Sequence, residues 1–155
     1  MSKFRDIWRS GFVTRYHANP DVPAETLAEH HCRTAQILCA ITKPSADLLR
    51  YALHHDCAEL IVGDLPWPFK RAHPDVASLH ADIEAKVLTE MCGSFNLTDR
   101  EARFAKLADR LAAHLYGSQY GDVEEWNADL VRIMIDAHSL DCVRSVTEII
   151  DAVQL

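Results

Sequence analysis

The chain has 155 residues and a net charge of −7, with 23 acidic against 16 basic side chains. This length is typical of one globular domain, here expected to span residues 1–155, and it allows a buried core without stabilising disulfides. The acidic balance argues against nucleic acid as a partner, because a protein that binds a phosphate backbone usually presents a basic face. A small phosphorylated molecule stays compatible, since one pocket needs only a metal ion and a few local cations.

The chain has no signal for a membrane or for secretion. Its apolar runs are only a few residues long, and its N-terminus lacks the continuous apolar stretch of a signal peptide. The five cysteines form no CxxC pair, which argues against a zinc ribbon or a thioredoxin-like site. We therefore expect reduced, mostly buried thiols in a cytoplasmic protein.

Helical periodicity dominates the chain, and no convincing alternation typical of a strand occurs, so we expect an all-α fold. The expected helices, in chain order, are 3–9, 26–41, 44–62, 74–91, 98–116, 126–140 and 143–153, with loops at 16–23 and 64–74. Pro44 favours the first turn of the third helix and Gly63 its end. Thr98 and Glu101 have the spacing of a capping box for the fifth helix.

The third predicted helix carries polar residues where a helix should bury its face. His55, Asp56 and Glu59 are three or four residues apart, so in a helix they would point toward one site. A buried imidazole beside two carboxylates is costly unless its charges are compensated. A divalent cation would compensate them, because it accepts imidazole nitrogen and carboxylate oxygen together. A surface or capping role is the usual alternative for an adjacent His-Asp pair.

A second candidate lies on the preceding helix. His30 shares an inward-facing stripe with Leu27 and Thr34, and His31 lies one residue around the helix. Either histidine is a possible metal ligand, and a hydrogen-bonded core histidine is the alternative for each. The residues alone do not separate them.

Two further acidic residues extend the set. Asp109 has Ala105, Ala112 and Ala113 on its face of the fifth helix, which predicts a carboxylate pointing into a tight interface; a structural salt bridge is the alternative. Asp64 directly follows the helix of His55, and a helix-terminating Asx turn is its alternative role.

These residues together resemble the metal site of the HD-domain phosphohydrolases. The closest branch contains the bacterial 5'-deoxynucleotidases and the phage-encoded dATP triphosphohydrolases. Its motifs appear in order as Arg15-Tyr16, Ala28-Glu29-His30, His55-Asp56-Cys57-Ala58-Glu59, Asp64-Leu65-Pro66 and Ala108-Asp109. The resemblance covers about residues 12–120 and implies an HD-domain bundle of about six to seven helices.

The resemblance also implies roles. A divalent metal ion (Co, Zn or Mn) is bound by His30, His55, Asp56 and Asp109, which decides between the two histidines in favour of His30. Glu59 positions or deprotonates the attacking water, and Asp64 protonates the leaving 5'-oxygen. The expected substrate-binding residues are Arg15, Tyr16, Pro66, Trp67 and Lys70, with the aromatic rings excluding a ribose 2'-hydroxyl.

The expected substrate is a 2'-deoxynucleotide attacked at its α-phosphorus. Arg15-Tyr16-His17 and the short interval between His30 and His55 look more like the phage enzymes, which favours dATP cleaved to deoxyadenosine and triphosphate. The alternatives are a deoxynucleoside monophosphatase and a binding protein without turnover. The family resemblance further implies a homo-oligomer, either a dimer or a larger ring.

Overall fold

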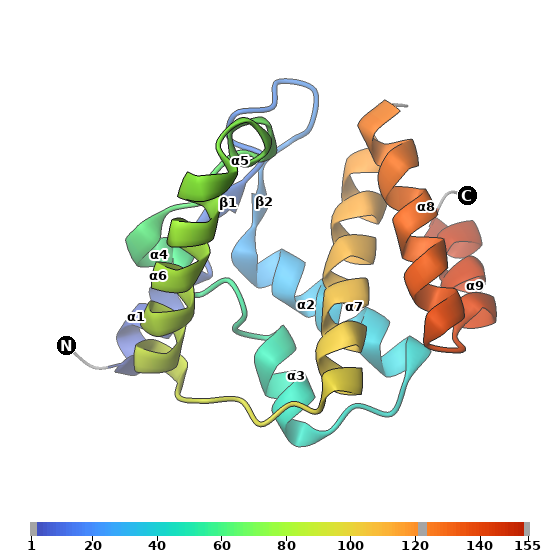
Figure 1. Cartoon of the computed structure of the whole chain (residues 1–155), viewed down its shortest axis with the longest axis horizontal. Helices are drawn as coiled ribbons and strands as arrows, with labels where there is room; N and C mark the ends of the chain where they lie inside the picture. Colours follow the sequence, from blue (N-terminus) through green and yellow to red (C-terminus); the bar gives the residue numbers. More distant parts are fainter. Residues whose placement is uncertain (1–2, 121–123, 154–155) are drawn as a thin grey trace. The chain divides into compact units, whose positions relative to one another are not determined.

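The computed structural model describes residues 3–120 and 124–153, with side chains described from residue 129 onward in the second stretch. Nine helices and two short strands occur within these residues, so the expectation of an all-α fold is confirmed (Figure 1). The elements are α1 (Lys3–Ser10), β1 (Thr14–Arg15), β2 (Glu25–Thr26), α2 (Leu27–Ile41), α3 (Ala46–Ala52), α4 (Glu59–Val62), α5 (Trp67–Ala72), α6 (Pro74–Cys92), α7 (Asp99–Ser118), α8 (Glu124–Ser139) and α9 (Val143–Val153).

The contacts within the chain divide it into two compact units. Unit 1 comprises residues 1–29 and 54–94, and unit 2 comprises residues 30–53 and 95–155. The chain passes from one unit to the other three times, after Glu29, after Leu53 and after Ser94. One domain for the whole chain stays a prediction.

In unit 1, helix α6 packs against α1, α4 and α5. The two strands pair antiparallel, with Thr14 opposite Thr26 and Arg15 opposite Glu25. A Cβ atom at Gly11 would lie 3.3 Å from the Ala28 Cβ, so glycine permits the start of α2 to approach the end of α1 closely. The absence of a side chain there helps to place the first turn of α2.

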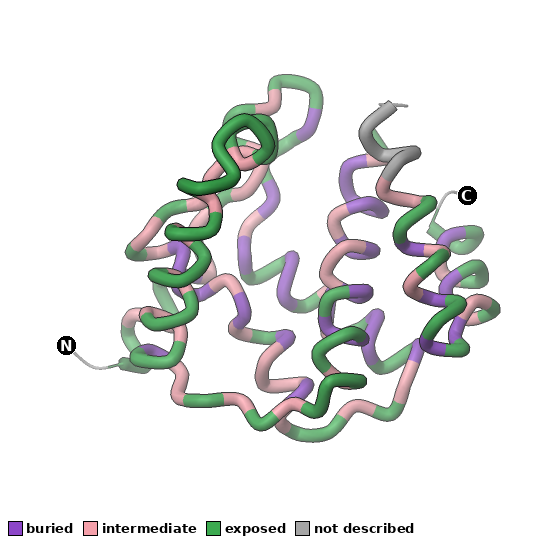
Figure 2. Tube along the Cα trace, in the orientation of Figure 1, coloured by how far each residue is buried: buried purple, intermediate pink, exposed green. Residues whose placement is uncertain are grey.

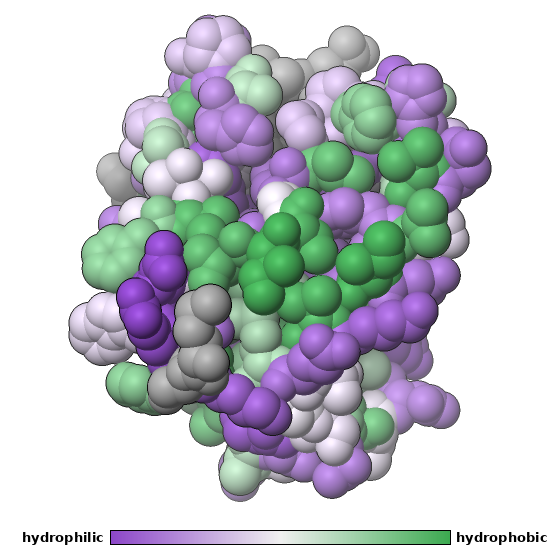
Figure 3. All heavy atoms as spheres, turned by 90° about the vertical axis from the view of Figure 1, so that its left-hand side faces the viewer, coloured by the Kyte–Doolittle hydropathy of each residue, from purple (hydrophilic) through white to green (hydrophobic). Residues whose placement is uncertain are grey.

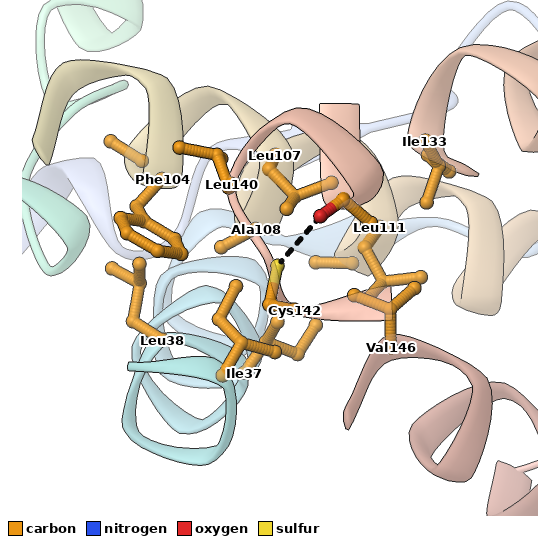
Figure 4. Close-up of a cluster of buried hydrophobic side chains, with 14 of the residues drawn as sticks. Ile37, Leu38, Phe104, Leu107, Ala108, Leu111, Ile133, Leu140, Cys142 and Val146 are labelled. Atoms are coloured by element: carbon orange, nitrogen blue, oxygen red, sulfur yellow. Dashed lines mark hydrogen bonds between the residues drawn. The ribbon is translucent and has the colours of Figure 1, made fainter. Parts of the chain in front are cut away.

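In unit 2, helix α7 is the centre of the hydrophobic core. Its apolar side chains pack with those of α2, α3, α8 and α9 (Figure 4). Leu107, Ala108 and Leu111 are fully buried, and Ile133 and Val146 reach the same cluster from α8 and α9. Cys142 also belongs to this cluster, and its thiol donates to the Ala137 carbonyl oxygen at 3.6 Å.

The prediction of one helix over residues 44–62 is wrong. Ser45 caps α3 through a bond from the Leu48 amide, and that helix ends at Ala52. Residues 53–58 form turns in which the Cys57 and Glu59 amides donate to carbonyls three residues earlier, the bonding of a tight turn. Only residues 59–62 resume an α-helix, which ends at Gly63 with φ 77°.

Two short elements were not expected. Residues 67–72 form α5 inside the segment predicted to be irregular, because Pro66 and Pro68 occupy the N-cap and first turn, where proline is tolerated. The strand pair was also missed, since two residues are too few to show an alternating pattern. The remaining predicted helices are confirmed, including the Thr98–Glu101 capping box. The side chain of Trp126, with which the predicted sixth helix begins, lies outside the described side chains, and Gly121, in the turn before that helix, lies outside the described residues.

The cysteines correct another expectation. All five are free thiols, but only Cys57 and Cys142 are buried, whereas Cys32 and Cys39 are exposed. The thiols of Cys32 and Cys39 therefore lie on the solvent-exposed side of α2 and not in the core. Among the described residues, no helix is long and apolar enough to cross a membrane.

Candidate functional site

His30 lies in the first turn of α2 and is fully buried. A reciprocal cap fixes this turn, because the Glu29 carboxylate accepts from the Thr26 amide at 2.9 Å while the Thr26 hydroxyl accepts from the Glu29 amide at 3.3 Å. His30 Nε2 is 2.9 Å from Asp109 Oδ1 on α7. His31 is buried as well, so burial does not separate the two histidines, but the contact with Asp109 favours His30.

Asp109 is more accessible than predicted. Its side chain is 41% exposed, so the carboxylate does not point into a closed interface, although Ala105 and Ala112 beside it are buried. Arg110, the next residue, forms a salt bridge with Asp136, to which its guanidinium donates at 2.6 Å. In unit 2, His30 and Asp109 therefore offer a nitrogen and an oxygen donor side by side.

His55 and Asp56 form a second pair of this kind in unit 1. They lie in the turns between α3 and α4, where His55 Nε2 is 3.4 Å from Asp56 Oδ2. His55 is buried, and the Asp56 side chain is 19% exposed. The turns place the two adjacent side chains close together, which consecutive helical positions would not do.

The Glu59 carboxyl has a strongly raised pKa. Glu59 begins α4, is 8% exposed, and its Oε2 atom has no hydrogen-bond partner within the described part of the chain. Burial, together with the negative charges of Asp56 and Asp64, raises the pKa of Glu59 to about 9. An ionised Glu59 thus needs a compensating positive charge.

Glu84 joins this group and was missed from the sequence. Its oxygen, one of Asp56 and one of Glu59 all lie within 4.8 Å of one another, and burial raises the pKa of Glu84 as well. It projects from α6 one turn after His80, which contacts it at 3.9 Å. A signal was present: His80 and Glu84 have i,i+4 spacing on the face of α6 that ends in the buried Met91.

Asp64 and Lys70 lie beside these carboxylates. Lys70 Nζ is 3.6 Å from Asp64 Oδ1, and both charges act on Glu84. Lys70 comes from the last turn of α5, whose first turn exposes Trp67 at 54% after the N-cap Pro66. The exposed indole is accessible to a ligand, as expected of a residue that contacts a base or sugar.

Arg15 is held by a buried partner that was also missed. Glu25 is fully buried opposite Arg15 in the strand pair, with 3.9 Å between Arg15 Nη1 and Glu25 Oε2. The guanidinium carbon lies 5.8 Å from the ring centre of Tyr16. Tyr16 has φ 60°, a left-handed conformation that is rare for a bulky residue. The buried Glu25 carboxylate therefore holds the Arg15 guanidinium, and the left-handed backbone at Tyr16 sets the direction in which the tyrosine side chain leaves the chain.

A divalent metal ion, the expected cofactor, fits this chemistry. The donors are histidine nitrogens and carboxylate oxygens, the set suited to Zn, Co or Mn. In unit 1 the unpartnered oxygen of Glu59 and the clustered carboxylates favour a bound cation, because three such groups are costly to ionise together.

Comparison with known proteins agrees with this chemistry. The model of the family described as "5'-deoxynucleotidase YfbR-like" matches residues 4–127. A 5'-deoxynucleotidase of Vibrio vulnificus is 25% identical over 137 residues, which are 72% of this chain and 71% of that protein. A 5'-deoxynucleotidase of Photorhabdus temperata is 28% identical over 137 residues, 72% of this chain and 70% of that protein.

One solved structure has a similar fold along almost the whole chain. It is the HD phosphohydrolase DatZ of cyanophage S-2L, bound to dA and one catalytic Zn²⁺ ion. The TM-score is 0.76, with 18% identity, and the match covers 99% of this chain and 98% of that one. The likeness establishes the HD-type helical fold.

Proposed function

The chain belongs to the YfbR-like 5'-deoxynucleotidase family, and on that premise we propose that it cleaves the bond between the α-phosphorus and the 5'-oxygen of a 2'-deoxynucleotide, with dATP preferred. The protein is an HD-type phosphohydrolase that acts on deoxynucleotides. The observation that carries the proposal is the buried carboxyl of Glu59, whose Oε2 atom has no hydrogen-bond partner among the described residues, close to Asp56 of the His55-Asp56 pair. A group with a raised pKa next to metal-binding donors is typical of an acid-base residue.

The proposed metal ligands are His30, His55, Asp56 and Asp109. Two observations support them: the His30–Asp109 contact of 2.9 Å and the His55–Asp56 contact of 3.4 Å each place a nitrogen donor beside an oxygen donor. When bound, the ion supplies Lewis-acid chemistry by withdrawing negative charge from the phosphoryl oxygens and lowering the pKa of water.

Glu59 and Asp64 are the proposed acid-base pair. Glu59 accepts a proton from the water whose oxygen attacks the α-phosphorus, and its raised pKa makes the ionised carboxylate a stronger base. Asp64 donates a proton to the 5'-oxygen as the bond between that oxygen and phosphorus breaks. Deoxynucleoside and a free phosphate chain are then the products.

Arg15 and Tyr16 are the proposed contacts to phosphate and sugar. Glu25 orients the Arg15 guanidinium, whose donors suit phosphate oxygens. The left-handed backbone of Tyr16 sets the direction of its Cα–Cβ bond, and its ring is proposed to exclude a 2'-hydroxyl. Pro66 and Trp67 are proposed to contact the base from the start of α5.

Two features favour a triphosphate over a monophosphate. Lys70 lies 3.6 Å from Asp64, and Arg71 follows it in the last turn of α5, so two cations lie just beyond the proposed acid. The Arg15-Tyr16-His17 segment and the short interval from His30 to His55 favour the phage type. The names of the Vibrio and Photorhabdus relatives instead favour a deoxynucleoside monophosphatase, which is the second candidate. Self-association and a cytoplasmic location stay predictions.

Product identity tests the proposal. The enzyme is incubated with Mn²⁺, Co²⁺ or Zn²⁺ and with dATP, dAMP or ATP, and the products are separated by ion-exchange chromatography. We expect deoxyadenosine and triphosphate from dATP, at least about 10-fold faster than phosphate from dAMP, and at least about 10-fold slower cleavage of ATP. Faster cleavage of dAMP would establish the monophosphatase, and release of pyrophosphate would show that another bond is cut.

Glu59→Gln is the matched control for this assay. It removes the acid-base group but keeps the size of the side chain, so turnover of every substrate should fall by about 100-fold or more while metal content is retained. A near-normal rate in this variant would contradict the role of Glu59. Nucleotide binding without any product in the unmodified protein would identify a binding protein and contradict the proposed enzyme.

A further inference from the structure

Unit 2 contains a cavity that shares no residue with the candidate site. Its volume is about 390 Å³, within the range typical of small-molecule sites, and its lining comes from α2, α7 and α9. It is a different feature from the surface patch of hydrophobic side chains that Figure 3 shows on the side of α1, α4 and α6. Those helices belong to unit 1, whereas the whole lining of the cavity belongs to unit 2.

The floor of the cavity is apolar. Ile37 of α2 and Leu115 of α7 are buried, and Ile149 of α9 is partly buried against the same core. Ala40 and Ala112 contribute only methyl groups, so the space that a larger side chain would occupy stays open. Transfer of an apolar group from water onto this floor is favourable. The floor therefore suits the apolar body of a ligand.

The rim of the cavity is polar and carries a positive charge. The Arg33 guanidinium carbon lies 4.9 Å from the ring centre of Tyr116, and both residues line the cavity. A guanidinium stacked on an aromatic ring presents its N–H donors in its own plane, in the fork that matches a carboxylate. Gln36 and Gln119 are exposed at the rim and add carboxamides, each of which can donate and accept.

The charge of this lining differs from that of the chain. The chain has 23 acidic residues and a net charge of −7, yet none of the acidic residues that the structure describes lines the cavity. Arg33 is the charged residue of the lining within the same part of the chain. An anion therefore meets an opposite charge here, whereas a cation meets a like charge.

We propose that this cavity is a second ligand site, which binds a small aromatic carboxylic acid. The ring of the acid packs on Ile37, Leu115 and Ile149, and the carboxylate accepts from the Arg33 guanidinium. The site is separate from the proposed metal ligands, although Arg33 follows His30 by one turn on α2. The inference does not depend on which deoxynucleotide is cleaved.

Three probes of similar shape and different charge test the site. The isotope-labelled full chain, loaded with Zn²⁺, is titrated with indole-3-acetate, indole-3-acetamide or tryptamine, and amide shifts are followed by NMR. We expect indole-3-acetate to bind with a Kd of about 1 mM or lower and to shift amides of α2, α7 and α9. The neutral amide and the cationic amine should bind at least about 10-fold more weakly, because neither forms a charge-assisted bond with Arg33.

Equal affinity for the three probes would overturn the assignment of an anion. Absence of binding by indole-3-acetate at about 5 mM would overturn the site itself.

Removal of the charge gives a matched comparison. Arg33→Met keeps a long side chain without its charge, so it should weaken indole-3-acetate by about 10-fold or more and leave indole-3-acetamide unchanged. Arg144→Met makes the same change on α9 at a side chain that is 92% exposed and does not line the cavity, and should affect neither probe. Unchanged binding of the acid to Arg33→Met would refute the proposed contact.

Filling the cavity tests its location. Ala40 lines the cavity from an exposed position, so Ala40→Trp should occupy the space without disturbing the core and should abolish binding of both indole probes. Ala102→Trp, at an exposed alanine of α7 outside the cavity, should leave binding unchanged. Circular dichroism verifies the fold of each variant. Binding that survives Ala40→Trp would place the acid elsewhere and contradict the proposal.

Discussion

Helices α6 and α7 are almost equally long, with 19 and 20 residues, yet they have opposite relations to solvent. Ten residues of α7 are buried, against Met91 alone among those of α6, and Figure 2 shows the same contrast along the two helices. Helix α7 contributes small and aliphatic side chains to a core shared with four other helices. Helix α6 places polar His80 and Glu84 inside and Val76, Leu79 and Ile83 outside.

The two helices therefore have different roles: α7 stabilises the core of unit 2, and α6 carries residues of the candidate site in unit 1. Helix α7 stabilises unit 2 by burying apolar area, and Asp109 is an acidic exception on it, accessible enough to reach a ligand. Helix α6 contributes little to a core, because its inward positions hold charged groups next to Asp56 and Glu59. Substitution of His80 or Glu84 should therefore affect the chemistry, whereas substitution of the buried apolar residues of α7 should affect the free energy of unfolding.

The largest difference is expected for a leucine in each helix. Leu111→Ala should lower the free energy of unfolding by about 2–5 kcal/mol, because it leaves a cavity in a fully buried site. Leu79→Ala should change it by less than about 0.5 kcal/mol, since that side chain is 61% exposed. Urea denaturation of the two variants measures both free energies. Equal losses would show that α6 shares the structural role of α7.

The carboxylates beside α6 should make the metal-free protein sensitive to pH. The pKa of Glu59 is raised from 4.5 to about 9, so between these values the folded state holds a proton that the unfolded state releases. The contribution of Glu59 to the free energy of unfolding should therefore be greatest below about pH 4.5 and fall as the pH rises to about 9. Glu59→Gln, measured with a chelator present, should flatten this fall.

Glu90→Gln is the control for this pH dependence, because Glu90 lies exposed on α6. It should leave the profile unchanged. A wild-type protein whose stability rises with pH, relative to Glu59→Gln, would show that Glu59 is ionised in the metal-free fold and would contradict the expected sign.

The smallest effect is expected at the helix starts. Helix α7 begins with a capping box in which the Thr98 side chain accepts from the Glu101 amide, whereas His73 before α6 makes no side-chain cap. Thr98→Ala should cost about 1 kcal/mol of unfolding free energy and His73→Ala only a few tenths. Thermal denaturation of the two variants measures the difference. A similar loss in both would mean that His73 stabilises α6 in another way.

Helices with clear ends and an amphipathic pattern were predictable from the sequence. The Thr98–Glu101 spacing located the start of α7, and Gly63 located the end of α4. The segment from Leu53 to Ala58 misled, because its i, i+4 polar spacing imitates a helix while its backbone forms turns. The periodicity of a sequence shows only at which spacing similar side chains follow one another. Short turns, in which an amide donates to the carbonyl three residues earlier, can show the same spacing as an α-helix.

The candidate site was predictable where its residues are adjacent or part of a motif. His55-Asp56 and Glu59 do come together in unit 1, and His30 does meet Asp109 in unit 2. Glu25 and Glu84 were missed, because each meets its partner only through folding: Glu25 by strand pairing with Arg15, and Glu84 by the packing of α6 on α4. A single sequence does not reveal such long-range partners.

The conformation of Tyr16 has a consequence for anyone who evolves or engineers this enzyme. A non-glycine residue at φ 60° costs about 1–3 kcal/mol of stability. Selection for thermal resistance alone would therefore favour glycine or asparagine at position 16, and a variant chosen in this way would lose the ring proposed to distinguish deoxyribose from ribose. Stability and sugar discrimination are opposed at this one residue, so a library screened for both properties should retain tyrosine there and gain its stability elsewhere.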